Sequence, residues 1–316
     1  MLNGIGPDGH IASLFPNRPQ QYEKKRKRRC RHFATLGGGG VMPPLPCAKV
    51  KRVAVIAVPI SLALASNEKP IVRILDSEED AAVALAEYTA NLSEKYIKQK
   101  GSFSVVLSGA NLINTMRKLL KPPYNTTIDW SKWLIFWVDE RVVPLDDPLS
   151  NYKLAFDGFL SKVPIPKSNI YPINYKKSPA DVAVDYESRL KKLVDEKIIP
   201  LSASKFPKFD LILLGVGFDG HVASLFPNRP QRYEKKRWVT FITDSPKPPP
   251  PRITLTFPVI NSASDIALVV LDKGKADIVA ATLGGAVVTP SLPCAEVKAE
   301  EELTWFLDKD TASKLK

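Results

Sequence analysis

The amino-acid sequence predicts an α/β protein in which a mostly parallel β-sheet is covered by helices on both faces. Its predicted strands are short and almost continuously apolar, which is typical of strands that are buried on both sides. These strands alternate with longer segments of helical periodicity, the pattern of a sheet whose strands are joined by crossover helices. With 316 residues, 44% of them hydrophobic, the chain can form one large α/β domain or one domain with an appendage.

The regular pattern starts with a short strand at residues 71–75. Asp76 or Ser77 can cap a helix that continues to about residue 100. The apolar face of this helix is formed by Ala81, Ala82, Leu85, Tyr88 and Leu92. Further strands are expected at residues 103–107, 134–138, 210–215, 238–242, 253–257, 266–271 and 303–307. Further helices are expected up to about residue 120 and at residues 150–163, 180–198 and 273–283.

The N-terminal quarter of the chain is a truncated duplicate of the C-terminal part. Residues 2–26 repeat residues 213–237 with few differences. Shorter matches pair residues 34–38 with 281–285 and residues 45–48 with 292–295, and the copy lacks about 36 residues between the matches. We expect residues 1–68 to be a poorly ordered appendage and residues 69–316 to be the active domain. A duplication and an unreliable gene model explain the copy equally well.

The net charge of +12 is concentrated in the first quarter of the chain. Residues 1–70 contain 12 Lys or Arg and 3 Asp or Glu, whereas the remainder contains 33 basic and 30 acidic residues. The main body therefore gives no electrostatic argument for a polyanionic partner. The basic run at residues 24–29 resembles a nuclear-localisation or nucleic-acid patch, but a solvated charge run explains it better, and nucleic acid is not expected as a partner.

The cysteines and apolar runs exclude further classes. Cys30, Cys47 and Cys294 are odd in number and lie outside any C-x-x-C pattern, which predicts a reducing compartment without a disulfide framework or a zinc site. The longest apolar run, residues 53–65, contains Pro59 and is shorter than the ~20 residues that a membrane-spanning helix needs. We therefore expect neither a metal nor a membrane partner.

Polar residues follow three of the predicted strands. They are Ser-Gly-Ala-Asn at 108–111, Asp-Glu-Arg at 139–141 and Gly-Val-Gly-Phe-Asp-Gly-His at 215–221. In open parallel sheets ligands bind outside the carboxyl ends of the strands. The candidate functional residues are therefore expected at this edge.

The third segment contains a formal G-x-G-x-x-G made by Gly215, Gly217 and Gly220. A dinucleotide site would need these glycines to open a long helix, with an acidic residue about 20 positions further on. Pro227 and Pro230 cut such a helix short, so a nucleotide cofactor is not expected.

Asp219 and His221 give the better hypothesis for this segment. A neutral imidazole can take a proton from water near neutral pH, and a carboxylate two residues away can orient the ring and stabilise its charged form. The competing interpretation is an aspartate at a helix start beside a packed histidine. The glycine-rich strand end favours the functional interpretation.

The other candidates are anion-binding residues. Arg141 is a plausible anion clamp, and Asp139 can orient substrate or water. The segment 108–111, with Ser108 and Gly109, lies between a strand and a helix start, where backbone N–H groups and the helix dipole favour a phosphate. Further candidates for the same role are Arg252, which opens a strand after a proline run, and Lys275, which lies at a helix start.

These motifs together resemble one enzyme family. Residues 215–227 (Gly-x-Gly-x-Asp-Gly-His-x-Ala-Ser-Leu-Phe-Pro) are similar to the signature of 6-phosphogluconolactonases. So are Trp-Val-Asp-Glu-Arg-Val-Val-Pro at 137–144 with Ser-Asn-Tyr at 150–152, and the Lys-Pro-Pro-Pro-Pro-Arg motif that opens residues 247–261. The resemblance covers about residues 71–316 and is closest to the plant members.

The resemblance implies a Rossmann-like fold of the deaminase and ribose-5-phosphate isomerase type. It implies hydrolysis of 6-phospho-D-glucono-1,5-lactone to 6-phospho-D-gluconate in the oxidative pentose phosphate pathway, without a cofactor and with the phosphorylated sugar lactone as the small-molecule partner. The oligomeric state stays open. His221 would be the general base, supported by Asp219, and Asp139 and Arg141 would line the lactone. The residues that would hold the phosphate or lie beside the substrate are Ser108, Gly109, Arg252, Lys275, Gly217 and Gly220.

Two residues depart from the family pattern. Ala110 replaces a glycine, and if that position needs φ > 0 it would cost about 1 kcal/mol or more and weaken phosphate binding. Phe218 stands where the family has proline, which the N-terminal copy keeps as Pro7. A weakened or inactive member of the same family is therefore the alternative hypothesis. A second site at Asp8 and His10 is not expected, because the copy lacks the other site residues.

The expected location is the cytoplasm, and a plastid or nuclear location stays open. Ser313-Lys314-Leu315 resembles a peroxisomal signal, but Lys316 follows it. Asp8 and Glu23 interrupt any transit-peptide character of the N-terminal segment.

Overall fold

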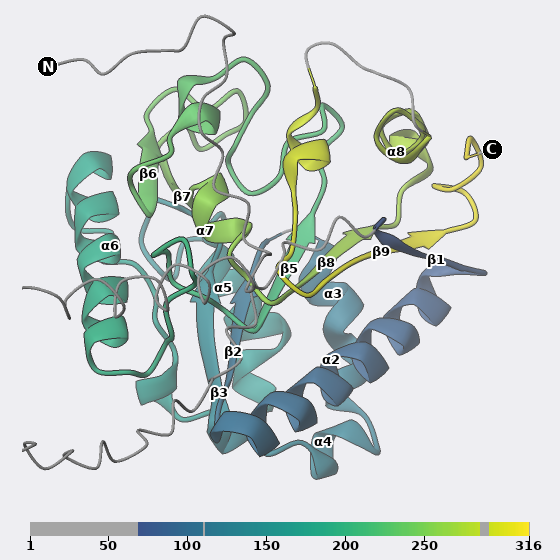
Figure 1. The fold of residues 1–316 in the computed structure, drawn as a ribbon, viewed down its shortest axis with the longest axis horizontal. Helices are drawn as coiled ribbons and strands as arrows, with labels where there is room; N and C mark the ends of the chain where they lie inside the picture. Colours follow the sequence, from purple (N-terminus) through teal and green to yellow (C-terminus); the bar gives the residue numbers. More distant parts are fainter. Residues whose placement is uncertain (1–68, 110, 285–290, 316) are drawn as a thin grey trace, which may run out of the picture. The chain divides into compact units, whose positions relative to one another are not determined.

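The computed structural model describes residues 69–109, 111–284 and 291–315. Its centre is a six-stranded, fully parallel sheet in the order β1-β9-β8-β5-β2-β3 (Figure 1). These strands are β1 (Ile71–Leu75), β2 (Phe103–Leu107), β3 (Trp133–Trp137), β5 (Leu211–Gly215), β8 (Asp265–Val270) and β9 (Glu302–Asp308). A smaller antiparallel sheet in the order β4-β7-β6 consists of β4 (Asp139–Arg141), β7 (Arg252–Leu255) and β6 (Val239–Ile242).

The helices alternate with the strands as the sequence predicts. The α-helices are α2 (Glu78–Lys100), α3 (Asn111–Thr115), α4 (Tyr124–Thr127), α5 (Asn151–Gly158), α6 (Pro179–Asp195), α7 (Phe257–Ile260) and α8 (Ala276–Leu283). Short 3₁₀ turns lie at Met116–Leu120, Trp130–Lys132, Leu160–Lys162, Lys167–Asn169, Pro230–Tyr233, Lys273–Lys275 and Pro293–Glu296. Ser77 is the N-cap of α2, since its Oγ accepts the N–H of Asp80 at 3.1 Å, and Gly101 ends the helix with φ 81°.

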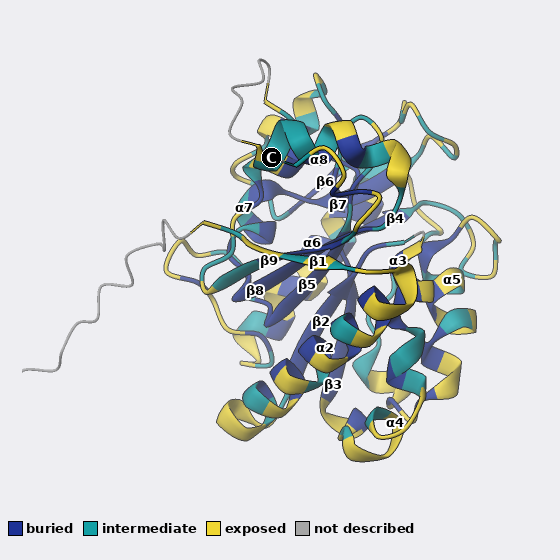
Figure 2. Ribbon diagram, turned by 90° about the vertical axis from the view of Figure 1, so that its right-hand side faces the viewer, coloured by how far each residue is buried: buried dark blue, intermediate teal, exposed yellow. Residues whose placement is uncertain are grey.

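Two apolar cores lie on the two faces of the main sheet. Residues of β2, β3, β5 and β8 alternate between them, as the two-residue period of a strand requires. One core joins the sheet to α6 and α7, and the other joins it to α2, α3 and α5. Figure 2 shows the strands as the most buried layer, with the exposed surface on the outer sides of the helices. The predicted fold class is therefore confirmed.

The small sheet is the main departure from the predicted elements. The segments expected as strands at 238–242 and 253–257 are β6 and β7, which pair with each other and not with the main sheet. The charged residues at 139–141, expected as a strand end, form β4 and pair with β7. The helix expected at 150–163 ends at Gly158. No helix of the described ranges has the length and apolar character needed to cross a bilayer. Residues 1–68, which contain the duplicate, lie outside the described residues.

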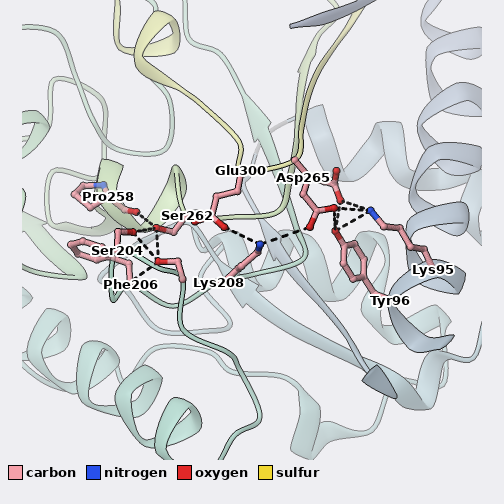
Figure 3. Close-up of polar contacts among 11 residues, drawn as sticks. Lys95, Tyr96, Ser204, Phe206, Lys208, Pro258, Ser262, Asp265 and Glu300 are labelled. Atoms are coloured by element: carbon pink, nitrogen blue, oxygen red, sulfur yellow. Dashed lines mark hydrogen bonds and ion pairs between the residues drawn. The ribbon is translucent and has the colours of Figure 1, made fainter. Parts of the chain in front are cut away.

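The amino-terminal edge of the main sheet is held by an ionic network (Figure 3). Tyr96 donates its hydroxyl to Oδ2 of Asp265, the first residue of β8, at 2.6 Å. Lys95 pairs with Glu301 at 3.0 Å and Lys208 with Glu300 at 2.8 Å. Burial raises the pKa of Asp265 to about 6. These carboxylates are occupied by structural partners at the edge opposite the candidate site.

Candidate active site

A cavity of about 530 Å³ opens at the carboxyl ends of β2, β5 and β8. It lies where open parallel sheets bind their ligands. Eight of the ten site residues expected from the sequence line it: Ser108, Gly109, Asp139, Arg141, Gly217, His221, Arg252 and Lys275. The other two, Asp219 and Gly220, do not line the cavity but belong to the turn that carries His221.

The turn after β5 is closed by its own backbone. The Gly217 N–H donates to the His221 carbonyl at 2.9 Å, and the Gly220 N–H donates to the Gly217 carbonyl at 3.0 Å. Gly220 has φ 78°, which only glycine adopts freely. A Cβ on Gly217 would come closer than 2.5 Å to the imidazole of His221. Gly220 thus allows the backbone of the turn to adopt a positive φ, and Gly217 allows the turn to pack directly against the imidazole of His221.

No helix follows this turn within residues 216–229, all of which the structure describes. A dinucleotide fingerprint needs its glycines to open a helix whose N-terminus meets the pyrophosphate. The geometry here therefore lacks that element. Asp219 likewise does not start a helix, so the competing interpretation of the Asp-x-His segment does not describe this turn.

His221 and Asp219 form a hydrogen-bonded pair. The ring Nδ1 bonds to Oδ1 of Asp219, and the ring packs against Phe226 with centroids 4.6 Å apart. Burial raises the pKa of Asp219, but the hydrogen bond and the charge of the imidazole outweigh it and lower that pKa to about 2. The side chain of His221 is 13% exposed and lines the cavity. With Nδ1 bound to a carboxylate, Nε2 is the nitrogen that can accept a proton.

Asp139 and Glu140 are buried side chains with different tasks. Asp139 lines the cavity, accepts the Ser224 hydroxyl at 2.7 Å, and receives the Asn151 amide at its main-chain oxygen at 3.0 Å. Glu140 accepts the backbone N–H groups of Asn151 and Tyr152, each at 2.7 Å, at the start of α5. Burial raises the pKa of Glu140 to about 7, although these backbone N–H donors act in the opposite direction. Both carboxylates are buried, with Asp139 5% and Glu140 1% exposed.

Arg252 is 3% exposed and is held by main-chain oxygens. Its Nε donates to Pro249 at 3.1 Å, its Nη2 to Lys247 at 2.8 Å and to Pro248 at 3.1 Å, and its Nη1 to the Ser224 hydroxyl at 3.4 Å. Burial lowers the pKa of Arg252. The expectation of a strand-opening arginine after the proline run is confirmed, and the loop of that run orients the guanidinium.

Arg141 lies beside Arg252 because the two residues are register partners in β4 and β7. Its Nη1 donates to the Leu149 carbonyl at 2.7 Å. Neither guanidinium is within salt-bridge distance of a carboxylate among the described residues. Two adjacent cations without a carboxylate partner are unfavourable unless an anion binds between or beside them.

Lys275 and Lys247 are the other cations of the cavity. Burial and the nearby charge of Lys247 lower the pKa of Lys275, against the opposing effect of Asp272. No ion pair of either lysine occurs in the part of the chain that the structure describes. The cavity therefore contains four cationic side chains and suits an anionic ligand.

The loop after β2 offers fewer free hydrogen-bond donors for a phosphate than the sequence suggests. The Ser108 N–H donates to the Leu213 carbonyl at 3.1 Å, so it is not free for a phosphate. Its hydroxyl accepts the Gly215 N–H at 3.1 Å and keeps its own proton to donate. A Cβ on Gly109 would come closer than 2.5 Å to the Asn151 side chain, so this glycine allows close approach of α5. Ala110, whose φ we expected to matter, lies outside the described residues.

Sequence reasoning missed four contributors: Glu140, Asn151, Ser224 and Lys247. All four belong to the segments that carry the family resemblance, but nothing in their residue types marks them. The sequence gives no reason to assign Glu140 a different role from the adjacent Asp139, or to separate Lys247 from the many lysines of the surface. No cluster of three or more His, Cys, Asp or Glu able to hold a metal ion is found in the described ranges.

Known proteins are similar to this chain in sequence and in fold. The family model of glucosamine-6-phosphate isomerases and 6-phosphogluconolactonases matches residues 76–305. The chain is 54% identical to 6-phosphogluconolactonase 3, chloroplastic, of Arabidopsis thaliana over 253 residues, 80% of this chain and 77% of the relative. It is 54% identical to probable 6-phosphogluconolactonase 5 of the same plant over 248 residues, 77% of this chain and 97% of that protein.

Solved structures of several proteins have the same fold as this chain. The devB protein matches with a TM-score of 0.68 and 30% identity over 78% of this chain and 100% of that chain. The 6-phosphogluconolactonase of Trypanosoma brucei matches with a TM-score of 0.69 and 25% identity over 78% of this chain and 99% of that one. A monomeric glucosamine-6-phosphate deaminase, 21% identical with a TM-score of 0.63, shares the fold.

Proposed function

Because the chain belongs to the family of glucosamine-6-phosphate isomerases and 6-phosphogluconolactonases, we propose that it hydrolyses 6-phospho-D-glucono-1,5-lactone with His221 as the general base. The relatives that are about half identical to it carry the name 6-phosphogluconolactonase, which makes it a carboxylic ester hydrolase. We place the reaction in the oxidative pentose phosphate pathway and assign it to residues 69–316.

One observation carries the proposal: a hydrogen-bonded histidine–aspartate pair and four cations without carboxylate partners line or support one cavity. The cations suit a phosphorylated substrate, and the pair suits proton transfer. Arg252 and Lys275 hold the phosphate together with the Ser108 hydroxyl, while Arg141 and Asp139 lie along the lactone ring. Held in this way, the substrate presents its carbonyl to a water beside His221, which lowers the entropic part of the barrier.

The chemical step needs only groups of this chain and water. Nε2 of His221 takes a proton as the water oxygen attacks the lactone carbonyl, and Asp219, ionised because its pKa is about 2, stabilises the imidazolium. Arg141 or backbone N–H groups stabilise the oxyanion. The bond between the carbonyl carbon and the ring oxygen then breaks, and the ring oxygen takes the proton from His221. The new carboxylic acid loses its proton to solvent.

The residues after His221 favour the lactonase branch over the deaminase branch. They read Val-Ala-Ser-Leu-Phe-Pro, whereas deaminases have Ala-Phe-Asn-Glu-Pro, so the acidic residue that the deaminases use is absent. Ser224 lies in this segment and donates its hydroxyl to Asp139. A glucosamine 6-phosphate deaminase assay should therefore give no turnover.

The test is lactone hydrolysis by the full chain, followed by oxidation of the product with a coupled dehydrogenase. We expect His221→Ala to lower kcat about 10²- to 10⁴-fold, because a general base contributes that much. Asp219→Asn should lower it less, with the fold intact by circular dichroism. Lys309→Ala is the control, since it removes a charged side chain that is 68% exposed and outside the cavity. Equal activity of His221→Ala and the wild type would remove the role given to His221.

The alternative, a weakened or inactive member of the family, is decided by the same assay. A wild-type chain that binds the product 6-phosphogluconate but does not accelerate lactone opening would support that alternative. Ala110→Gly would then be the variant that restores turnover.

We propose the cytoplasm as the location. Relatives from Arabidopsis thaliana and rice are named chloroplastic, which makes the plastid the competing location. A fluorescent fusion of the full chain, followed in cells of the source organism, distinguishes the two.

A further inference from the structure

Phe218 is an exposed aromatic residue at the rim of the cavity. It lies between Gly217 and Asp219 in the turn that carries the catalytic pair, lines the cavity, and is 59% exposed. Its ring contacts the turn that carries Lys275.

The contact with that turn is direct. The Nζ of Lys275 lies 5.2 Å from the centroid of the Phe218 ring, within the ~6 Å range of a cation–π interaction. A Cβ on Gly274 would lie 2.9 Å from Cε1 of Phe218, so the ring occupies the space that a side chain would need. The Asp272 carboxylate accepts the Gly274 N–H at 2.9 Å and fixes the turn from the other side.

This contact connects two separate parts of the site. The turn with Phe218 follows β5, and the turn with Lys275 follows the neighbouring strand β8. The two strands are neighbours in the sheet, and the Phe218 ring adds a side-chain contact between the turn after β5, which contains His221, and the turn after β8, which contains Lys275. A displacement of the ring would change the position of Lys275 relative to His221.

An aromatic ring and a carboxylate have different effects on an ammonium group that they contact. A carboxylate partner would neutralise Lys275 and compete with an anionic ligand, whereas a π face attracts the cation and leaves its charge uncompensated. Lys275 has no carboxylate partner within the described ranges, and burial lowers its pKa. The ring thus orients the lysine while keeping it available to a phosphate.

The hydrogen bonds that close the turn join the backbones of Gly217, Gly220 and His221, so none of them uses the side chain of Phe218. The duplicated segment at the N-terminus has Pro7 at the corresponding position, in an otherwise nearly identical stretch of sequence. Substitution of Phe218 should therefore change the contact with Lys275 more than it changes the backbone of the turn.

We propose that Phe218 is a positioning residue, which holds the ammonium of Lys275 in place for the phosphate of the substrate. The proposal deepens the proposed function and rests on it. It predicts that Phe218 affects binding of the anionic group and leaves the chemical step at His221 unchanged.

The experiment compares Phe218→Leu with Phe218→Tyr in the full chain. The leucine variant keeps apolar bulk and loses the π face, and the tyrosine variant keeps both. For Phe218→Leu we expect KM for the lactone and Kd for inorganic phosphate to rise about 3- to 10-fold, the factor that corresponds to a cation–π contact of about 1 kcal/mol. The value of kcat should stay within a factor of two, and Phe218→Tyr should restore both constants.

Tyr233→Leu is the matched control. Tyr233 is 58% exposed and its ring also meets a cation, Arg232 at 5.8 Å, but it does not line the cavity. Unchanged KM and phosphate Kd in Phe218→Leu, a loss confined to kcat, or a tyrosine variant as impaired as the leucine variant would each overturn the proposal. Phosphate binding is measured by titration calorimetry, which does not depend on turnover. If the chain has no lactonase activity, the proposed function is refuted, and the phosphate Kd values of the variants still test the positioning role of Phe218.

Discussion

Replacing Gly217 by alanine should disable the enzyme without unfolding it. Gly217 does not have a positive φ, so alanine fits its backbone. A Cβ there would come closer than 2.5 Å to Nδ1 and Cε1 of His221 and would lie 2.8 Å from Oδ1 of Asp219. Ordinary non-bonded contacts need about 3.5 Å, so the imidazole must move by about 1 Å or more.

A displacement of that size costs about 10²-fold in rate when it misplaces a reacting group. We expect kcat of Gly217→Ala to fall about 10²-fold or more, while the thermal unfolding midpoint changes by only a few degrees, since the ring can move towards the cavity. The assay is steady-state lactone hydrolysis together with thermal unfolding.

Gly215→Ala is the matched control for this substitution. It adds the same methyl group two residues earlier, where the nearest atom is Oγ of Ser108 at 3.8 Å, an ordinary contact. We expect its kcat to stay within a few-fold of the wild type. A folded Gly217→Ala enzyme with wild-type kcat would refute both the placement of the ring and its role.

Three further predictions concern groups that support the site and the sheet. Arg252→Lys should raise KM about 10-fold, because lysine cannot keep the fork that donates to three main-chain oxygens and still reach the cavity; an unchanged KM would contradict the role of the guanidinium. Glu140→Ala should lower the free energy of unfolding by about 2–4 kcal/mol in urea, since the N–H groups of Asn151 and Tyr152 lose their acceptor; a loss below 1 kcal/mol would show that water replaces it. Burial raises the pKa of Asp265 to about 6, so its contribution to stability is present below about pH 4 and is lost as the pH rises through about 6. Between about pH 4 and pH 7 the wild type should therefore lose about 2–3 kcal/mol of unfolding free energy relative to Asp265→Asn, and a difference independent of pH would contradict that shift.

The main sheet could be predicted because its strands are buried on both faces. Segments such as Phe103–Leu107 and Trp133–Trp137 are predominantly apolar and are buried at every position, so they have no alternative as exposed strands. The bounds of β1 and β2 equal the expected ones, and those of the other strands of the main sheet differ by one residue at one or both ends. At strand ends the backbone pairing, and not the side-chain pattern, sets the bound. The end of α5 at Gly158 had a visible signal, the glycine itself.

The antiparallel sheet could not be predicted because its strands are short and one of them is charged. Asp139–Arg141 pairs with Arg252–Leu255, more than a hundred residues away, and no local pattern encodes such a pairing. The same limit explains the missed role of Glu140. Successive residues of a strand point to opposite sides, so Asp139 reaches the cavity and Glu140 reaches α5, but the sequence does not say which carboxylate takes which side.

The candidate site residues could be predicted because glycine spacing and charge mark strand ends. The residues that hydrogen-bond to them carry no such mark and could not be predicted. Ser224 and Asn151 act by hydrogen-bonding Asp139, a role that their residue types share with many surface serines and asparagines. The Ser108 N–H already donates to the Leu213 carbonyl of the neighbouring strand. Whether a donor is already occupied depends on tertiary pairing.

The walls of the cavity come from six stretches of chain that meet only in the folded protein: the loop after β2 with α3, the loops after β5 and β8, the β4 segment, the start of α5 and the proline-rich approach to β7. A phosphorylated ligand can therefore bind the native state and has no comparable affinity for the unfolded chain. Such selective binding adds about 2.7 kcal/mol to the unfolding free energy when the free ligand is at 100 times its Kd. Under the proposed function, metabolite concentration determines how long the enzyme resists proteolysis, independently of its turnover rate.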